Sequence, residues 1–329
     1  MIQQAVIYNG WKVLLCAPSN IAVDNVLERL VSASSTPSTT NMKSKKLKVV
    51  RIGHPARISN TKALEHSLEA LVNAADGTEI VNDCKKELAQ SVKMMISYNN
   101  KTNTASSSNA HQRKKIRLEI NSLRKEIRTR EEAVVSEILL GANVVCATNV
   151  GASIVKKPKF NNKLLFDLVI IDEAAQALEA SCWIPALCGK RLVLVGDHRQ
   201  LPPTIRSPKV SSQLGFTMFD RAMKIYDSKT ISRMLTIQYR MHKDISDWSS
   251  KAMYHGKLVP ADSVAQWTLK DLPNVTCNAS LSADDYELIN TTLLLIDTAG
   301  CDMEESVLSS GSRYNEGEAS IVQNHGKLL

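Results

Sequence analysis

Short, continuous runs of apolar residues recur along the chain, separated by stretches whose periodicity is typical of helices. The runs cover residues 12–16, 47–52, 143–148, 166–172, 191–196 and 292–297. Their β-branched and aliphatic residues follow one another instead of alternating with polar ones, and such runs are typical of strands buried on both faces of a parallel sheet. The sequence therefore predicts an α/β fold in which each run is a strand.

Polar residues follow four of these runs at the point where each strand would end. They are Pro18-Ser19-Asn20, Thr148-Asn149, Asp172-Glu173 and Gly196-Asp197. Ligands of open α/β sheets bind outside the carboxyl ends of the strands. We therefore expect a ligand site at that edge of the sheet.

The segment FDLVIIDEAAQ at 166–176 ends its apolar run with two adjacent carboxylates, Asp172 and Glu173. In a nucleotide hydrolase of this plan, the first acid holds Mg²⁺, usually through water, and the second accepts a proton from the attacking water. Asp172 is thus the candidate metal and cofactor ligand, and Glu173 the candidate catalytic base. Strands that end in Asp-Glu are common by chance, so the neighbouring motifs must support these roles.

The next motif is LVLVGDHRQLPP at 192–203, in which a glycine turn and polar residues follow an apolar run. A glutamine after such a strand can bind a terminal phosphate or position the attacking water, and Gln200 is that candidate. A surface loop with a proline stop is the alternative, but it does not explain why polar groups gather there.

A third motif, QYRMH at 238–242, lies near the start of the last third of the chain. Arg240 could stabilise charge on a transferred phosphoryl group, and Tyr239 could stack on a base. The start of an amphipathic helix is the alternative interpretation of the same pentapeptide.

Between the second and third runs the sequence has helical periodicity. One apolar stripe is Ile80, Cys84, Leu88, Val92 and Met95, and another is Ile116, Ile120, Leu123 and Ile127. The two stripes predict an antiparallel helical hairpin with residues 99–110 at its tip.

The second helix of this hairpin is strongly basic. Its cations are Arg113, Lys114, Lys115, Arg117, Arg124, Lys125, Arg128 and Arg130. They could form a solvated face with pairs such as Glu126 with Arg130, or a surface that contacts phosphates. The net charge of +8 suits a phosphate-rich partner but does not select one.

Other features narrow the class of protein. The apolar runs are far shorter than the roughly 20 residues needed to cross a bilayer, and the N-terminus lacks the pattern of a secretory signal. We therefore expect an intracellular protein of the nucleus, the cytoplasm or both. The seven cysteines form no C-x-x-C pair, which favours reduced structural thiols over a zinc site.

These motifs, together with APSNIAVDN at 17–25, RIGHPAR at 51–57 and CATNVGA at 146–152, resemble one family. The chain resembles the superfamily 1 helicases related to the nonsense-mediated-decay RNA helicase. EASCWIP at 179–185 and LLIDTAGC at 294–301 resemble the branch of the immunoglobulin mu-binding protein and the DNA polymerase alpha-associated helicase.

This resemblance implies an architecture of RecA-like P-loop NTPase domains. Residues 1–60 and 141–237 would form an incomplete first RecA-like domain, 61–140 an inserted helical subdomain, and 238–329 a linker and the truncated start of a second domain. ATP and Mg²⁺ would bind between the two domains, and a single strand would cross both.

The resemblance also implies roles for particular residues. Pro18, Ser19 and Asn20 match the first strand-gripping motif, and Thr148 matches a later one, in which hydroxyls and backbone amides hold phosphates. Asp172, Glu173, Gln200, Tyr239 and Arg240 match residues of the ATP site. The implied activity is ATP-driven 5′ to 3′ unwinding by a monomer on single-stranded DNA or RNA. The choice between DNA and RNA stays open, because these motifs contact the backbone.

One expected element is not in the sequence. No segment matches G-x-x-x-x-G-K-[ST], and the pairs at Gly189-Lys190, Gly256-Lys257 and Gly326-Lys327 lack its other residues. In the family, this loop precedes the segment that resembles residues 3–10, and the last motifs follow the helix that resembles residues 315–319. Two hypotheses therefore stand: part of an ATP-dependent helicase, or a fragment that binds nucleic acid or proteins without hydrolysing ATP. For the 329 residues alone we favour the second.

Overall fold

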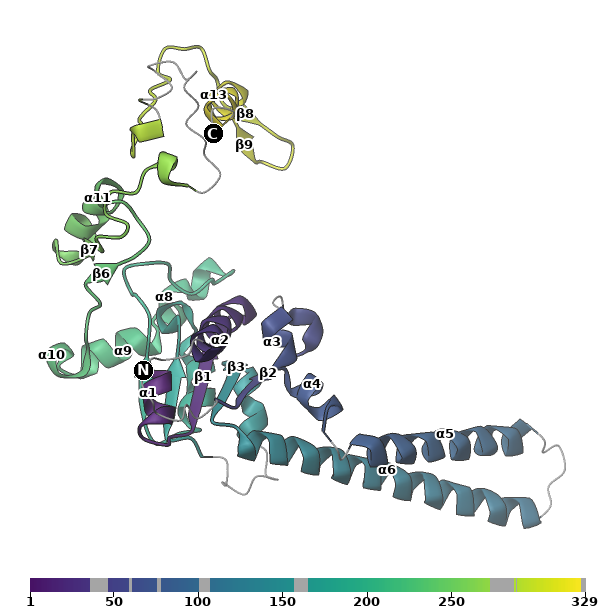
Figure 1. Ribbon diagram of the computed structural model, residues 1–329. Coiled ribbons are helices and arrows are strands. Elements are labelled where there is room, and N and C mark those ends of the chain that lie inside the picture. The colour runs from purple at the N-terminus through teal and green to yellow at the C-terminus, as the bar shows by residue number, and fades with distance from the viewer. Residues whose placement is uncertain are drawn as a thin grey trace. The chain divides into compact units, whose positions relative to one another are not determined.

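A five-stranded parallel sheet forms the centre of the N-terminal part of the chain (Figure 1). The strands are β1 (Val13–Ala17), β2 (Val49–Ile52), β3 (Val144–Thr148), β4 (Leu168–Ile171) and β5 (Leu192–Leu194), in the order β2-β3-β1-β4-β5. The predicted α/β class is confirmed, and five of the predicted runs contain a strand of this sheet.

The computed structural model describes residues 1–35, 47–58, 61–75, 78–100, 107–156, 165–272, 287 and 289–326. They belong to two compact units, Met1–Thr230 and Ile231–Leu329, and each unit is described by itself.

Helices pack on both faces of the sheet, and this explains the continuous apolar runs. Successive residues of β1 contribute to opposite clusters, with Leu14 and Cys16 in one, and Val13, Leu15 and Ala17 in the other. The helices of the N-terminal unit are α1 (Ile2–Ile7), α2 (Asn20–Ser35), α3 (Thr61–Glu65), α4 (Leu68–Asn73), α5 (Thr78–Asn100), α6 (Ser107–Gly141), α7 (Glu179–Ala186), α8 (Ser211–Leu214) and α9 (Met218–Ile225), with α10 (Ser228–Ile231) at the junction. Short 3₁₀ turns occur at Pro55–Arg57, Gly151–Lys156, Ala174–Gln176 and Pro208–Val210.

The two faces are covered by different helices. Buried residues of α1, α2 and α3 contact one face, while α7, α9 and the end of α6 contribute to the other cluster. Burial raises the pKa of the Cys146 thiol to about 12, so this core cysteine stays protonated near neutral pH.

β5 is the last strand of the sheet on its side and is less covered than the other four. Within the described residues it pairs with β4 alone. Leu192 of β5 is 40% exposed, and Val195, which follows the strand, is 38% exposed. In contrast, every residue of β1 is buried. An edge of this kind can pair with a further strand.

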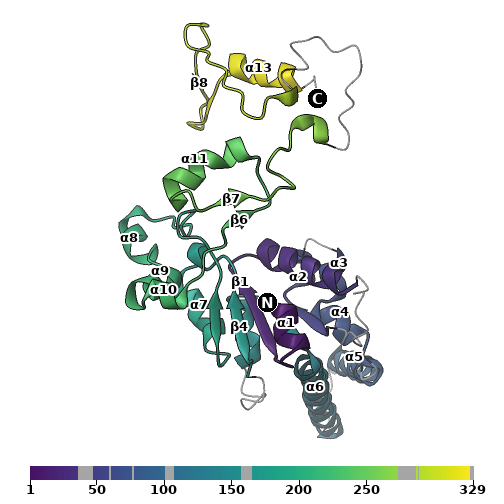
Figure 2. The same ribbon diagram turned by 60° about the vertical axis from the view of Figure 1, so that its left-hand side comes forward.

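The predicted hairpin is present, with α5 and α6 packed side by side (Figures 1 and 2). Cys84 of α5 is buried against Ile127 of α6. The first position of the predicted α5 stripe is wrong, because Ile80 is 51% exposed and Val81 is buried in its place. A shift of one residue turns a side chain by about 100° around a helix. Part of the predicted tip, residues 101–106, lies outside the described residues.

The C-terminal unit has two small sheets. β6 (Ile237–Gln238) pairs in parallel with β7 (Val259–Pro260), and β8 (Ser306–Val307) pairs antiparallel with β9 (Arg313–Tyr314). Its helices are α11 (Lys243–Tyr254) and α13 (Glu316–Gly326), with a 3₁₀ turn at Leu269–Asp271.

The strand predicted at 292–297 is wrong. These residues adopt no regular structure, and Leu295 is 90% exposed. A strand needs a neighbour for its backbone hydrogen bonds, and none is found beside this run in the part of the chain that the structure describes. No helix among the described residues is long and apolar enough to cross a membrane.

Candidate nucleic-acid interface and nucleotide site

The predicted strand-gripping residues meet at the carboxyl edge of the sheet. The register of β1 and β3 pairs Ala17 with Thr148, so Pro18, Ser19 and Asn20 follow directly beside Thr148. A cavity of about 750 Å³ opens there and is lined by both Asn20 and Thr148. Pro18 and Ser19 are exposed. The structure thus brings together residues that are far apart in the sequence.

A buried arginine holds the Asn20 side chain. Arg51 of β2 is fully buried, and its guanidinium donates to Asn20 Oδ1 at 3.0 Å and to Asp24 Oδ1 at 2.7 Å. Asp24 is only 2% exposed, so the two opposite charges are paired inside the protein. Asn20, in contrast, is only partly buried and reaches the cavity.

Thr148 is held by the turn that follows β3. Its Oγ1 accepts a hydrogen bond from the backbone N–H of Gly151 at 3.1 Å. A Cβ at position 151 would lie 2.8 Å from that oxygen, so a residue other than glycine would displace the hydroxyl. Gly151 therefore allows the turn that positions Thr148.

The base of the hairpin completes the cavity. Lys85 of α5 and Glu131 of α6 line it and form an ion pair of 2.8 Å. His54 and Arg57 line it from the turn after β2, and both are exposed. The cavity therefore joins the sheet edge to the hairpin.

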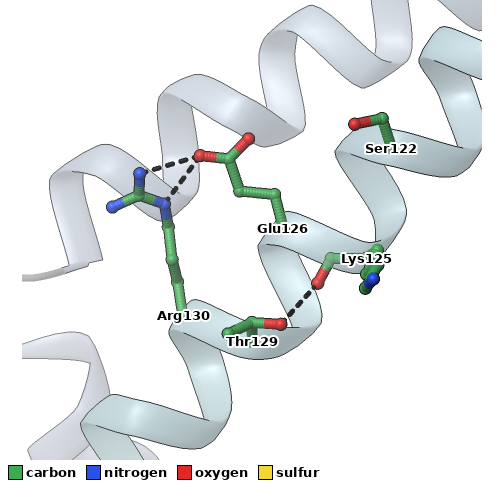
Figure 3. A pocket seen from close by; sticks show the side chains of 5 residues that line it. All are labelled: Ser122, Lys125, Glu126, Thr129 and Arg130. Carbon is green, nitrogen blue, oxygen red and sulfur yellow. Dashed lines mark hydrogen bonds and ion pairs between the residues drawn. The ribbon is translucent and has the colours of Figure 1, made fainter.

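Some of the cations of α6 are already paired with acids on the same helix. Figure 3 shows Arg130 against Glu126. The guanidinium donates to Glu126 Oε1 from two nitrogens, at 2.7 and 3.0 Å. Arg128 pairs with Glu132 at 3.4 Å. For Arg130 the predicted pair with Glu126 is confirmed.

Three other predicted cations of α6 are more open. Lys114, Lys115 and Arg124 are exposed, and no ion pair links them to another described residue. At about 100° per residue, positions 114, 117, 124, 125 and 128 fall within about 100° of one another around the helix. They form a stripe beside the buried face that includes Ile116 and Ile120.

Asp172 and Glu173 lie just after β4, at the same edge of the sheet. Asp172 is partly buried, and its Oδ1 accepts from the backbone N–H of Glu173 at 3.0 Å. Burial raises the pKa of Asp172, although that hydrogen bond and the charge of Arg29 act in the opposite direction.

Glu173 has a left-handed backbone, with φ of 51° and ψ of 37°, which is uncommon for a residue other than glycine. Its Oε2 accepts from Gln176 Nε2 at 3.0 Å. Carboxylates are hard oxygen donors of the type that Mg²⁺ prefers, so the chemistry of Asp172 suits the ion predicted for it.

The loop that carries Gln200 passes close to this pair. The carbonyl of Val195 accepts from the N–H of Ala174, and a Cβ at Gly196 would lie 2.9 Å from the backbone N of Ala175. Gln200 itself is exposed, and its Nε2 donates to Asp197 Oδ2 at 2.8 Å. The loop is thus next to the acidic pair, while the Gln200 amide is bound within its own loop.

Tyr239 and Arg240 lie in the C-terminal unit, directly after β6. Gln238 Oε1 accepts from the backbone N–H groups of Arg240 and Met241 at 2.7 and 2.8 Å. This turn leaves Tyr239 71% exposed and Arg240 exposed. Both side chains are therefore accessible to a ligand within their own unit.

Two family models cover almost the whole chain. A model described as an AAA domain matches residues 2–208, and a second with the same description matches residues 214–329. The DNA-binding protein SMUBP-2 of Mesocricetus auratus is 42% identical over 331 residues, covering 100% of this chain and 30% of that protein. The DNA polymerase alpha-associated DNA helicase A of Saccharomyces cerevisiae is 36% identical over 343 residues, covering 99% of this chain and 46% of that protein.

A third relative is named for the regulation of nonsense transcripts. The regulator of nonsense transcripts 1 homolog of Neurospora crassa is 34% identical over 315 residues, covering 95% of this chain and 24% of that protein. The chain belongs to the superfamily 1 helicases related to the nonsense-mediated-decay RNA helicase. It spans less than half the length of each of these relatives.

Sequence reasoning missed the buried pair of this helicase chain, Arg51 with Asp24. Arg51 stands inside the apolar run 47–52, and Asp24 stands on the apolar side of α2 near Val23 and Leu27. Charged residues are almost never fully buried unless they are paired. A charge within each of two apolar segments was therefore the signal that could have predicted the contact.

Proposed function

We propose that this chain is the strand-holding and ATP-hydrolysing part of an intracellular, monomeric ATP-dependent helicase that moves 5′ to 3′ along single-stranded DNA or RNA. The observation that carries the proposal is one sheet edge that presents Asn20 after β1, Thr148 at the end of β3, and Asp172 and Glu173 after β4. Residues for binding a strand and residues for hydrolysis thus end on the same rigid element.

In this proposal each acidic residue has one task. Asp172 holds Mg²⁺ through water, and Glu173 accepts a proton from the water that attacks ATP. When bound, the ion neutralises charge on the phosphates. The left-handed backbone of Glu173 is a conformation that clusters at functional sites, which supports a role of its own for this acid.

The other nucleotide-site residues act on the phosphates and the base. Gln200 would leave Asp197 and bind the terminal phosphate, so that its loop responds to the nucleotide state. Arg240 would stabilise charge on the transferred phosphoryl group, and Tyr239 would stack on the adenine. These roles place residues 238–329 as a linker and the start of a second RecA-like domain, after a first domain made of 1–60 and 141–237 with 61–140 inserted.

The strand would run from the sheet edge along the hairpin. Pro18, Ser19, Asn20 and Thr148 contact its phosphates through neutral groups, and Lys114, Arg124 and Arg128 contact them through charge. Lys115 lies about 180° from Arg124 around α6, away from this path. Positions 114 and 128 are about 21 Å apart along α6, which is long enough to follow several phosphates.

For the 329 residues by themselves we propose binding without hydrolysis. The observation that favours it is the lack of any G-x-x-x-x-G-K-[ST] segment in the sequence, since that loop cradles the phosphates that Asp172 and Glu173 act on. An alternative within this second function is a fragment that binds partner proteins.

The decisive experiment compares ATP turnover in two chains, each with and without single-stranded DNA. The 329-residue chain should hydrolyse ATP at the background rate. A chimera that adds a phosphate-binding loop ahead of Gln3 and a complete second domain should hydrolyse it rapidly. Glu173→Gln should abolish turnover by the chimera without weakening strand binding.

Glu87→Gln supplies the control, because Glu87 is an exposed acid of α5 that is not among the residues lining the cavity. Robust turnover by the 329-residue chain that Glu173→Gln removes would contradict the proposal for the chain alone. Turnover by the chimera that survives Glu173→Gln would contradict the role of Glu173.

A further inference from the structure

We propose that Arg51 is a positioning residue that fixes the direction of the Asn20 amide, so that Asn20 Nδ2 faces the cavity and donates to a phosphate oxygen of the bound strand. The inference rests on the proposed strand binding and adds to it a buried residue that determines how one contact is made.

The chemistry of the two side chains determines the direction of the amide. A guanidinium can only donate hydrogen bonds, so the Asn20 atom that meets it at 3.0 Å is the oxygen. The Nδ2 group then points the other way. Among the described residues it has no hydrogen-bond partner, and Asn20 lines the cavity. Two N–H donors are therefore available to a ligand that can only accept.

Arg51 itself has little freedom to move. It donates to Asp24 Oδ1 at 2.7 Å and to the carbonyl of Ile52 at 2.6 Å, besides Asn20. A Cβ at Gly53 would lie 3.0 Å from Arg51 Nη1, so the glycine leaves room for the guanidinium. Three acceptors, two on α2 and one on β2, thus hold the planar guanidinium of Arg51. The fixed guanidinium in turn determines the orientation of the Asn20 amide.

The Arg51–Asp24 pair is electrically neutral, so its effect on strand binding differs from the attraction that an exposed cation exerts on phosphates. Arg51 and Asp24 are buried and in contact, so they add little net charge at the cavity. Arg51 therefore acts on the strand through the geometry of Asn20 and not as a cation at the surface.

Thr148, which lies beside Asn20 at the same edge of the sheet, is arranged in the same way. Its oxygen accepts from the N–H of Gly151, which leaves the hydroxyl hydrogen to donate. The side-chain oxygens of Asn20 and Thr148 thus both accept a hydrogen bond from the protein. Each side chain keeps a donor for a ligand in the cavity. Two oriented donors suit a phosphodiester, because its non-bridging oxygens only accept hydrogen bonds.

The first test replaces the donor without removing the partner of Arg51. In Asn20→Asp one carboxylate oxygen still accepts from Arg51, but an acceptor with a negative charge replaces Nδ2. Affinity for a fluorescent oligothymidylate should fall by about tenfold or more, the size expected when a hydrogen bond to a charged group is removed. Asn25→Asp is the matched control, because it adds the same charge at an exposed position of α2 and should change affinity little.

The second test addresses Arg51 directly. Arg51→Lys keeps a charge for Asp24 but lacks the planar fork that reaches Asn20. Its affinity should fall to that of Asn20→Ala, and the double variant should bind no more weakly than either single variant, because both remove the same interaction. Thermal unfolding of Arg51→Lys shows whether the variant is folded at the temperature of the assay.

A measurement on the unmodified protein keeps the inference testable if Arg51→Lys does not fold. In a ¹⁵N spectrum, the side-chain NH₂ signals of Asn20 should shift when the oligonucleotide is added. Unshifted Asn20 signals, or equal affinities for Asn20→Asp and the wild type, would overturn the inference while leaving strand binding intact. No binding by the wild type would overturn the proposed function and this inference with it.

Discussion

The carboxyl edge of the sheet and the outer face of α6 are proposed to contact the same strand, but they are built in opposite ways. Asn20 and Thr148 are neutral and tied by hydrogen bonds to buried or backbone groups. Lys114 and Arg124 are charged and exposed, and no ion pair to another described residue holds them in place.

Because of this difference, one region attracts the strand and the other determines its position. Charged side chains on α6 release counterions from the phosphates and so provide affinity that depends on salt. Oriented neutral donors at the sheet edge add little long-range attraction, but they determine where a phosphate sits. A motor that moves along a strand needs both.

The largest expected effect is on stability and distinguishes the buried network from the exposed pairs. Arg51→Met leaves Asp24 buried without its cation, which should lower the free energy of unfolding by about 3–5 kcal/mol. Arg130→Met removes an exposed pair on α6 and should leave the urea midpoint nearly unchanged. Equal midpoints for the two variants would show that the network does not hold the sheet edge.

The next effect concerns affinity and salt. Reversing Lys114, Lys115, Arg124 and Arg128 to Glu should weaken single-strand binding and flatten its salt dependence, by about 0.7 in the logarithmic slope for each phosphate that the variant no longer neutralises. Fluorescence anisotropy at several salt concentrations measures both quantities. Unchanged binding would return α6 to the alternative of a solvated face.

The smallest effect distinguishes two cations of the same helix. Arg124→Gln should lower affinity a fewfold, whereas Arg130→Gln should not, because Glu126 already engages the Arg130 guanidinium (Figure 3). Anisotropy titrations of the two variants at low salt make the comparison. A larger reduction for Arg130→Gln would mean that the Glu126 pair opens to bind the strand.

The sheet was predictable because burial on both faces leaves a direct mark in the sequence. Five continuous apolar runs contain strands, and the polar residues that follow four of them lie at one edge. The run at 292–297 is similarly apolar, yet it forms no strand. Composition indicates that a segment can form a strand, but it does not show whether a neighbouring strand is present for pairing.

The site was predictable only in part, for a related reason. Motif residues such as Asn20 and Thr148 could be identified one by one from the sequence, and the paired register of β1 and β3 then places their loops side by side. The hydrogen bond between Arg51 and Asn20 depends on how β2 and α2 pack together, since the two residues are 31 positions apart. Motifs that are recognised one residue at a time do not show that these two side chains are in contact.

The most direct test of the account is whether one strand contacts both regions at once. Hydrogen–deuterium exchange of the 329-residue chain should be measured with and without a single-stranded oligonucleotide. The account predicts slower exchange at 18–22, at 148–152 and along 112–128 in the same complex, at oligonucleotide concentrations that saturate binding. Protection along α6 with none at 148–152, or protection confined to the C-terminal unit, would contradict it.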